Sequence, residues 1–358
     1  MMADRRKTRQ VMVGGVPIGG DAPITVQSMT TTKTYDVEAT IQQIKRLEEA
    51  DCQIIRVTVP DKRSADALPE IKRHMTVPLV ADIHFDYRMA LLAVDAGVDK
   101  IRINPGNIGS RDRVKAVLDK VKSANLPIRI GVNAGSLEKQ LLEQYGFPTA
   151  EAMVDSARHH IDICQEHGFE DIVVSLKASD TRLMIDAYQL FSQEFDYPVH
   201  LGVTEAGPAV SGTIKSAVGI GTLLAQGIGD TIRVSLTDDP VKEVQAGFEI
   251  LKSLGIVSKG VTIVACPTCG RLEVDLFKIA SAMEEKLKNV KTPISLALMG
   301  CAVNGPGEAS HTDLGIAFGK GGGLLYYKGH SVGRVREDEA IDRLLELIRK
   351  FESTEGKD

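Results

Sequence analysis

The amino-acid sequence predicts an α/β fold, a (β/α)8 TIM barrel followed by a small α/β domain. Eight short runs rich in Val and Ile alternate with longer amphipathic stretches, and a second, shorter series of strands and helices follows them. Strands that alternate with helices pair in parallel, and eight such units in about 250 residues are typical of a closed barrel. An open doubly wound sheet is the alternative arrangement.

The eight barrel strands are expected where β-branched residues, which favour extended backbone, are concentrated. They are predicted over residues 24–29, 53–59, 78–84, 100–104, 128–133, 171–177, 199–204 and 231–237. Between them apolar residues recur with the helical period, which predicts helices over residues 38–50, 88–96, 111–124 and 153–167. A last barrel helix over residues 240–254 ends before Gly255, a residue that commonly terminates helices.

Five of the predicted strands carry a basic residue between mainly aliphatic neighbours. These residues are Arg56, Arg102, Arg129, Lys177 and Arg233. Neighbouring strand residues point to opposite faces, so if the aliphatic residues pack against the helices, the five cations point into the barrel lumen. The same alternation places further polar residues in the lumen. They are Thr58, Asp82, His84, Asn104, Asn133, Ser175, Thr204 and Ser235.

The excess of positive charge predicts an anionic ligand. The acids near the strand ends are mainly Asp82 and Glu205, which leaves a surplus of about three cations, and an unpaired buried charge is costly. Arginine binds phosphate oxygens with two parallel donors, so a compact, multiply charged anion such as a diphosphate fits this lumen. Internal salt bridges are the alternative. Neither a Walker motif nor a dinucleotide fingerprint is present, so ATP and NAD are not indicated.

The predicted domains are residues 1–257, a barrel that binds substrate, and residues 258–358, a smaller domain with its own βα order. Strands are expected over residues 261–265 and 294–299, with a strand pair around 314–327 joined by a glycine-rich turn. Helices are expected over residues 274–290 and 337–351. Loops that leave the C-terminal ends of adjacent strands can meet at one point, which brings the cysteines of this domain together.

Three cysteines of the second domain can hold a metal centre. Cys266 and Cys269 form a Cys-Pro-Thr-Cys turn, and Cys301 lies on a distant Gly-Pro-Gly loop. A zinc ion or an iron–sulfur cluster takes four protein ligands, and Glu308, on the loop of Cys301, is the nearest candidate for the fourth. A cluster is the favoured interpretation, and a zinc site with His311 as its fourth ligand is the alternative.

Composition favours a cytoplasmic enzyme. Five cysteines are few and odd in number, which does not suit a disulfide framework. The net charge of -5 argues against non-specific binding to nucleic acid or to an anionic membrane. No apolar run reaches the length of a transmembrane helix, and the first ten residues lack the apolar core of a secretory signal.

Four segments carry a family resemblance that covers essentially the whole chain. They read Cys266-Pro-Thr-Cys269-Gly-Arg, Gly300-Cys301-Ala-Val-Asn304-Gly-Pro-Gly-Glu308, Gly131-Val-Asn133-Ala-Gly-Ser-Leu-Glu138 and Gly202-Val-Thr204-Glu205-Ala-Gly. Together they resemble the 4-hydroxy-3-methylbut-2-enyl diphosphate synthase family in its bacterial two-domain form. The resemblance implies the two-electron reductive ring opening and dehydration of 2-C-methyl-D-erythritol 2,4-cyclodiphosphate in the non-mevalonate isoprenoid pathway. It also implies flavodoxin or ferredoxin as the electron donor.

The resemblance further implies roles for individual residues. A [4Fe-4S] cluster would be held by Cys266, Cys269, Cys301 and Glu308. The residues implied to bind substrate are Arg56, Asp82, His84, Arg102, Arg129, Asn133, Lys177, Glu205 and Ser235, to which strand alternation adds Arg233. Glu205 enters this set through the resemblance alone, because it is one residue out of phase with the lumen. Glu205 is the expected proton donor to the departing hydroxyl, with His84 as the second choice.

Chain geometry predicts a head-to-tail homodimer. The helix over residues 240–254 runs back for about 22 Å to the bottom of the barrel, and the next six residues span at most about 20 Å. A cluster domain that starts there meets an active site most simply on a partner's barrel.

Two other functions remain open: a zinc-containing barrel lyase or hydrolase acting on a phosphorylated substrate, and a non-catalytic cluster sensor or scaffold.

Overall fold

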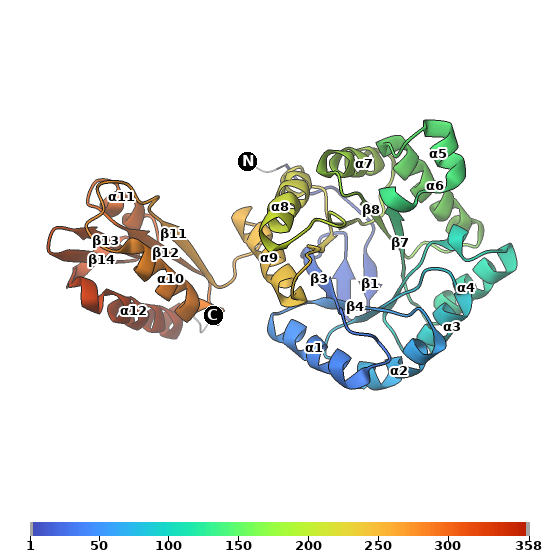
Figure 1. The fold of residues 1–358 in the computed structure, drawn as a ribbon, viewed down its shortest axis with the longest axis horizontal. Helices are drawn as coiled ribbons and strands as arrows, with labels where there is room; N and C mark the ends of the chain where they lie inside the picture. The colour runs from blue at the N-terminus through green and yellow to red at the C-terminus, as the bar shows by residue number, and fades with distance from the viewer. Residues whose placement is uncertain (1–2, 356–358) are drawn as a thin grey trace. The chain divides into compact units, whose positions relative to one another are not determined.

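The computed structural model describes residues 3–355 and divides into two compact units between Leu254 and Gly255. The first unit is a ring of helices around parallel strands, and the second is a smaller sheet with helices (Figure 1). Across the described residues, no helix combines the length and the apolar character that crossing a membrane requires.

Eight parallel strands form the barrel of the first unit. They are β3 (Thr25–Met29), β4 (Ile54–Thr58), β5 (Leu79–Asp82), β6 (Lys100–Arg102), β7 (Ile128–Asn133), β8 (Ile172–Lys177), β9 (His200–Leu201) and β10 (Thr231–Ile232). Their order is β8-β7-β6-β5-β4-β3-β10-β9, and a parallel bridge between Val174 and Val199 joins the two ends of this sheet. The predicted TIM barrel is confirmed, and the open-sheet alternative is wrong.

Helices alternate with these strands and form the outer ring (Figure 1). They are α1 (Val37–Glu49), α2 (Lys62–Arg73), α3 (Tyr87–Asp95), α4 (Arg111–Ser123), α5 (Lys139–Tyr145), α6 (Ala150–Glu166), α7 (Thr181–Glu194), α8 (Ala209–Ala225) and α9 (Pro240–Ser253). Several begin at an aspartate whose side chain accepts a backbone N–H of the first turn, as Asp61 does from Ser64. The short helix α5 was not predicted, and it extends the connection that follows β7.

A β-hairpin before the barrel, β1 (Val11–Val13) and β2 (Val16–Ile18), was also missed. Its apolar side chains form one buried cluster with residues near the beginnings of three barrel strands. The cluster contains Val11, Val13, Ile18, Ile54, Val80 and Val173. Because parallel strands all begin at one end of a barrel, the hairpin closes the N-terminal end of the lumen.

The second unit is a five-stranded sheet of order β11-β12-β13-β14-β15, parallel as far as β13 and antiparallel beyond it. The strands are β11 (Val261–Ala265), β12 (Ile294–Met299), β13 (Leu314–Gly319), β14 (Gly322–Tyr327) and β15 (His330–Val335). Helices α10 (Leu276–Leu287) and α12 (Ala340–Glu355) share the main core with one face of the sheet. The small helix α11 (Gly305–Ser310) packs against the other face through Ala309.

Most predicted elements of this unit are found, with two differences. The strand over residues 261–265 and the strand over 294–299 have the predicted bounds, and the glycine-rich turn joins β13 to β14 as expected. Strand β15 was not predicted. A loop was predicted over residues 301–308, but residues 305–310 form α11, since proline is tolerated in the first turn of a helix.

Candidate functional site

A buried charge network occupies the lumen of the barrel. Asp82, at the end of β5, lies between two guanidinium groups: its Oδ2 is 3.5 Å from Nε of Arg56 and its Oδ1 is 3.2 Å from Nη1 of Arg102. Burial alone would raise the pKa of Asp82, but these two cations outweigh it and hold the pKa at about 2. Asp82 is therefore ionised and fixes the orientation of both arginines.

Two further cations in the lumen, Arg129 and Lys177, have no carboxylate partner among the described residues that compensates their charge. Arg129 is fully buried, and its Nη1 donates to Oγ of Ser175 at 2.8 Å. Lys177 is also buried, and within residues 3–355 its ammonium group makes neither an ion pair nor a hydrogen bond. Burial and the neighbouring cations Arg129, Arg233 and Arg56 push the pKa of Lys177 well below its usual value. An anion in the lumen would relieve this repulsion.

Arg233 differs from the other cations because it has a buried partner that sequence reasoning missed. Its Nε and Nη2 donate to the two carboxylate oxygens of Glu243, each at 3.1 Å. Glu243 also accepts hydrogen bonds from Ser28 and from the backbone N–H of Leu236. The count of acids was wrong in naming Glu205: that residue is exposed, and Glu243 of α9 replaces it. With Lys100 of β6, which is also fully buried, six basic side chains of the lumen face the carboxylates of Asp82 and Glu243, so the surplus over the described residues is four.

Two glycines in the strand sequence make room for these long side chains. A Cβ atom at Gly131 would lie 2.6 Å from Nε of Arg102, and one at Gly202 would lie 2.7 Å from Nζ of Lys177. A side chain at Gly131 would displace the guanidinium group of Arg102. A side chain at Gly202 would also lie 2.6 Å from the backbone oxygen of Arg233, so movement of Lys177 alone would not make room for it. Both glycines belong to the motifs that carried the family resemblance, and their role is to admit charge into the lumen.

Polar residues surround the network at the C-terminal ends of the strands. Nδ2 of Asn133 lies 3.5 Å from Oγ1 of Thr204, and Asn104 exchanges two hydrogen bonds with the backbone of Gly131. Thr58 and Ser235 are half-buried.

The two candidates for acid–base chemistry, His84 and Glu205, are exposed at the same rim. Burial of its ring, partly offset by Asp82, lowers the pKa of His84, which favours the neutral imidazole. Glu205 has a φ of 51°, in the left-handed region that side chains seldom adopt. Such strain persists where the surrounding structure requires it, and it is common at functional sites.

Two residues deeper in the lumen also carry ionisable side chains. Lys100 lies two residues before Arg102 on β6, so both side chains point into the lumen. It is fully buried, and within residues 3–355 its Nζ has no hydrogen-bond partner. Sequence reasoning passed over it although the same alternation would have found it. His200 is likewise fully buried, and burial with the nearby Lys177 pushes its pKa well below the usual value. His200 is therefore neutral.

His160 of α6 is buried, whereas its neighbour His159 is exposed. The ring of His160 is 1% exposed: Nδ1 accepts the backbone N–H of Gly106 at 3.0 Å, and Nε2 lies 2.9 Å from Oε1 of Glu138. Oε1 of Glu138 also accepts from Ser156. One helix, α6, thereby anchors the loops that follow β6 and β7, which are the loops next to Asn104 and Asn133.

The loops that carry the three predicted thiol ligands leave the C-terminal ends of neighbouring strands in the second unit. Cys266 follows β11 and donates its backbone N–H to Leu298 of β12, while Cys301 follows the end of β12. The backbone of Leu272 bonds to Cys269, and the next residue, Glu273, bonds to Gly300, so the Cys-Pro-Thr-Cys loop is tied to the Cys301 loop. Parallel neighbouring strands end at the same edge, which is why residues far apart in sequence converge.

The donors at this edge suit an iron–sulfur cluster. The backbone N–H groups of Val303 and Asn304, together with Arg271, lower the pKa of the Cys301 thiol and favour the thiolate that binds metal. Glu308 is exposed on α11, and His311 follows at the end of that helix. Within the described residues, no three His, Cys, Asp or Glu side chains converge as a single metal ion requires. Cluster ligands bind different irons and need not converge on one point.

Comparison with known proteins gives the family of both units. A model described as the GcpE TIM-barrel domain matches residues 8–248, and one described as the GcpE protein C-terminal domain matches residues 262–350. The chain is 58% identical over 347 residues to the 4-hydroxy-3-methylbut-2-en-1-yl diphosphate synthase (flavodoxin) of Geobacillus thermodenitrificans, covering 97% of this chain and 93% of that protein. It is 56% identical to the enzyme of the same name from Bacillus mycoides, covering 97% and 95%.

Solved structures with low sequence identity share the fold of the barrel. A dihydropteroate synthase from Stenotrophomonas maltophilia aligns with a TM-score of 0.51 at 14% identity, covering 70% of this chain and 99% of that one. An N-acetylneuraminic acid synthetase from Leptospira borgpetersenii serovar Hardjo-bovis aligns with a TM-score of 0.51 at 12% identity, covering 78% and 97%. At these identities the likeness concerns architecture alone.

The contrast between Lys177 and Arg233 predicts opposite effects on stability. Lys177→Met removes an uncompensated buried cation, so the free energy of unfolding of the ligand-free protein should stay unchanged or rise. Arg233→Met leaves Glu243 buried without its cation and should lower that free energy by about 3–5 kcal/mol. Urea unfolding of the two variants under identical conditions measures the difference. Equal destabilisation by both would show that Lys177 has a stabilising partner.

The buried contacts of His160 predict a second difference in stability. His160→Ala leaves the N–H of Gly106 and the carboxylate of Glu138 without this partner and should cost about 1–3 kcal/mol of unfolding free energy. His159→Ala, at the exposed neighbouring position on the same helix, is the matched control and should change stability by less than about 0.5 kcal/mol. Similar losses in the two variants would contradict a specific role for the buried ring.

Proposed function

The chain belongs to the GcpE family, and from this membership we infer that it is an enzyme of the non-mevalonate isoprenoid pathway. It is an oxidoreductase that converts 2-C-methyl-D-erythritol 2,4-cyclodiphosphate to 4-hydroxy-3-methylbut-2-enyl diphosphate, with two-electron reduction, ring opening and loss of water. One structural observation carries this function: within residues 3–355, the lumen holds four more basic side chains than carboxylates, and a cyclic diphosphate supplies the missing negative charge. The zinc-dependent alternative has no support from the family.

We propose that Cys266, Cys269, Cys301 and Glu308 hold a [4Fe-4S] cluster. When bound, the cluster supplies electrons one at a time, which no side chain can do. The backbone hydrogen bonds that tie the two cysteine loops together support this ligand set, as does the exposed carboxylate of Glu308 on the helix that follows Cys301. Iron and sulfide analysis of protein purified without oxygen, combined with turnover of the cyclic diphosphate under a strong reductant, tests the function as a whole.

The residues of the barrel divide into binding and proton-transfer roles in this proposal. Arg56, Arg102, Arg129 and Lys177 bind the diphosphate and stabilise the negative charge released when the ring opens. Asp82 holds Arg56 and Arg102 in place. The remaining residues proposed to contact the substrate lie at the rim or beside Glu243, and they are Asn133, Ser235 and Arg233. Glu205, exposed at the mouth, donates the proton to the departing hydroxyl, and His84 is the second candidate.

The proposal also covers the surroundings of the enzyme. Flavodoxin is the expected electron donor, as the names of the relatives indicate, and ferredoxin is the alternative. The five cysteines are free thiols, which suits the cytoplasm, the compartment we propose.

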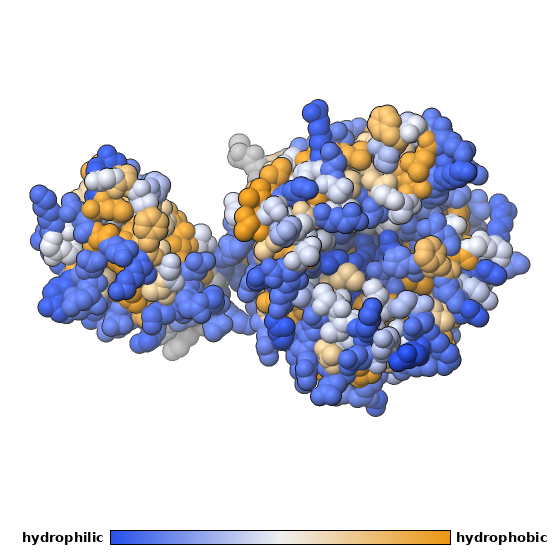
Figure 2. All heavy atoms as spheres, viewed as in Figure 1, coloured by the Kyte–Doolittle hydropathy of each residue, from blue (hydrophilic) through white to orange (hydrophobic). Residues whose placement is uncertain are grey.

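We further propose a head-to-tail homodimer in which each cluster serves the partner's barrel. Helix α8 exposes an apolar stripe of Val210, Ile214 and Val218, spaced four residues apart, and hydrophobic residues gather on the surface over this helix (Figure 2). Exposed apolar surface of this kind is typical of interfaces between subunits and supports self-association.

The proposed ligand set predicts different outcomes for two substitutions. Glu308→Ala should fold and assemble a cluster that loses iron readily, because three thiolates remain. Cys301→Ala should prevent stable assembly. The iron-to-protein ratio and the electron paramagnetic resonance signal of each variant measure the outcome, with circular dichroism as the control for folding. Full cluster content and full turnover in Glu308→Ala would rule Glu308 out as a ligand.

The proposed dimer predicts complementation between two inactive variants. A Lys177→Met chain lacks a binding cation, and a Cys301→Ala chain lacks the cluster. If each cluster serves the partner's barrel, a mixed dimer contains one site with an intact barrel and an intact cluster. Co-expression with two different affinity tags isolates the heterodimer, whose turnover should approach half that of the unmodified dimer. An isolated heterodimer without activity would place each site within one chain.

A further inference from the structure

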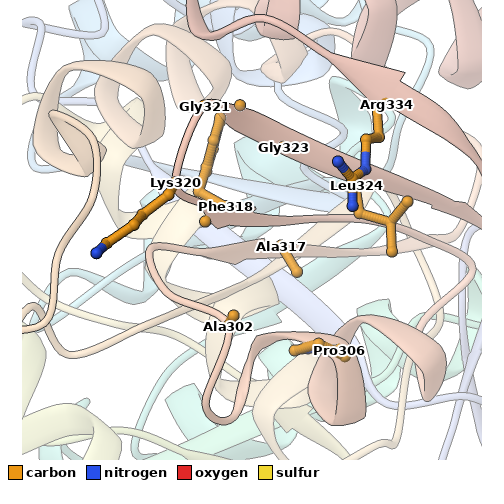
Figure 3. A pocket seen from close by; sticks show the side chains of 11 residues that line it. Ala302, Pro306, Ala317, Phe318, Lys320, Gly321, Gly323, Leu324 and Arg334 are labelled. Atoms are coloured by element: carbon orange, nitrogen blue, oxygen red, sulfur yellow. The ribbon is translucent and has the colours of Figure 1, made fainter.

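A pocket of about 290 Å³ lies in the second unit, beside the segment proposed to carry two of the cluster ligands. Ala302, which follows Cys301, and Pro306, two residues before Glu308, form part of its wall (Figure 3). The glycine-rich turn between β13 and β14 forms another part and packs on the ligand segment, since a Cβ at Gly319 would lie 3.8 Å from that of Ala302. The pocket therefore lies beside the segment of Cys301 and Glu308.

Two cations line this pocket from separate strands. Lys320 belongs to the turn after β13, and Arg334 lies on β15, where it is paired in register with Leu324 of β14. Figure 3 shows the two side chains extending on different sides of the turn. Both are exposed, and within residues 3–355 neither makes an ion pair. In a chain with a net charge of -5, two unpaired cations at one recess form a local positive patch.

Apolar surface accompanies the charge. Ala317 and Leu324 line the pocket on the sheet face that α10 and α12 leave uncovered. Val303, next to Ala302, is 65% exposed. Small apolar contacts with charged groups around them are typical of transient complexes, in which opposite charges speed up encounter and small contact areas permit rapid release.

We propose that this pocket, defined by Lys320, Arg334, Ala302 and Pro306, is the docking site of the protein that delivers electrons. The partner presents carboxylates to Lys320 and Arg334, and its redox group approaches the segment of Cys301 and Glu308. This inference rests on the proposed function, because it assumes a cluster held by that segment. A buried small-molecule site is disfavoured, since both cations are exposed to solvent, whereas the cations of the barrel are enclosed.

Charge reversal separates docking from catalysis. The variants Lys320→Glu and Arg334→Glu are compared with Lys278→Glu, which makes the same change at an exposed position of α10, a helix of the other sheet face. Turnover of the cyclic diphosphate is measured with reduced bacterial flavodoxin and, separately, with dithionite and methyl viologen. Each pocket variant should raise the KM for flavodoxin at least tenfold at low salt, and the control should change it by less than twofold. With the small reductant, all three variants should keep the rate of the unmodified enzyme.

Calorimetric titration with flavodoxin provides a second measurement that does not depend on turnover. The Kd should weaken at least tenfold in the two pocket variants and should weaken with salt in the unmodified protein. An unchanged Kd and KM would overturn the proposal. An equal loss of turnover with flavodoxin and with the small reductant would also overturn the proposal. It would assign the patch to the substrate site or to contact with a second copy of the chain. An unmodified protein that is inactive with both reductants would instead contradict the proposed function, and the Kd comparison would still decide the docking site.

Discussion

The concentration of positive charge inside a closed barrel is the constraint on which the rest of the first unit depends. A parallel barrel turns every second strand residue inward, and here those positions carry cations instead of the branched apolar residues that usually fill such a lumen. Three devices make this interior compatible with folding. Asp82 bridges Arg56 and Arg102, Glu243 reaches in from α9 to Arg233, and glycines leave room beside Arg102 and Lys177. The charge that remains unpaired is what a diphosphate would neutralise.

The alternation of side chains along each strand predicted much of this interior, because the face to which a strand residue points depends only on its neighbours in sequence. Arg56, Arg102 and Arg129 could be placed in the lumen from their aliphatic neighbours alone. Glu243 could not, because its partner is ten residues away on a strand, and nothing local distinguishes an acid that points inward from the acids on the outer face of a helix. The burial of His160 could not be predicted for the same reason: its contacts, Gly106 and Glu138, come from loops that only the closed barrel brings to α6.

The first and last residues of strands and helices were predicted well where apolar residues dominate the segment. They were predicted poorly where polar residues dominate it. Strands β9 and β10 are each two residues long, although longer runs were expected, because the residues that follow them serve the lumen and leave the ladder. The hairpin β1–β2 has strands too short to show a clear period. In the second unit, the thiol ligands were found from motif spacing, while the approach of their loops depends on adjacent parallel strands and on Gly300, where any Cβ would collide with Leu272.

The hairpin at the N-terminal end of the barrel determines how substrate enters and how product leaves. Val11, Val13 and Ile18 block the N-terminal end of the lumen with apolar side chains, which gives a charged molecule no favourable path through that end. Substrate must then enter and product must leave through the same opening, at the C-terminal end of the barrel. Product that lingers competes directly with substrate, and the speed of its exit sets an upper limit on the catalytic cycle.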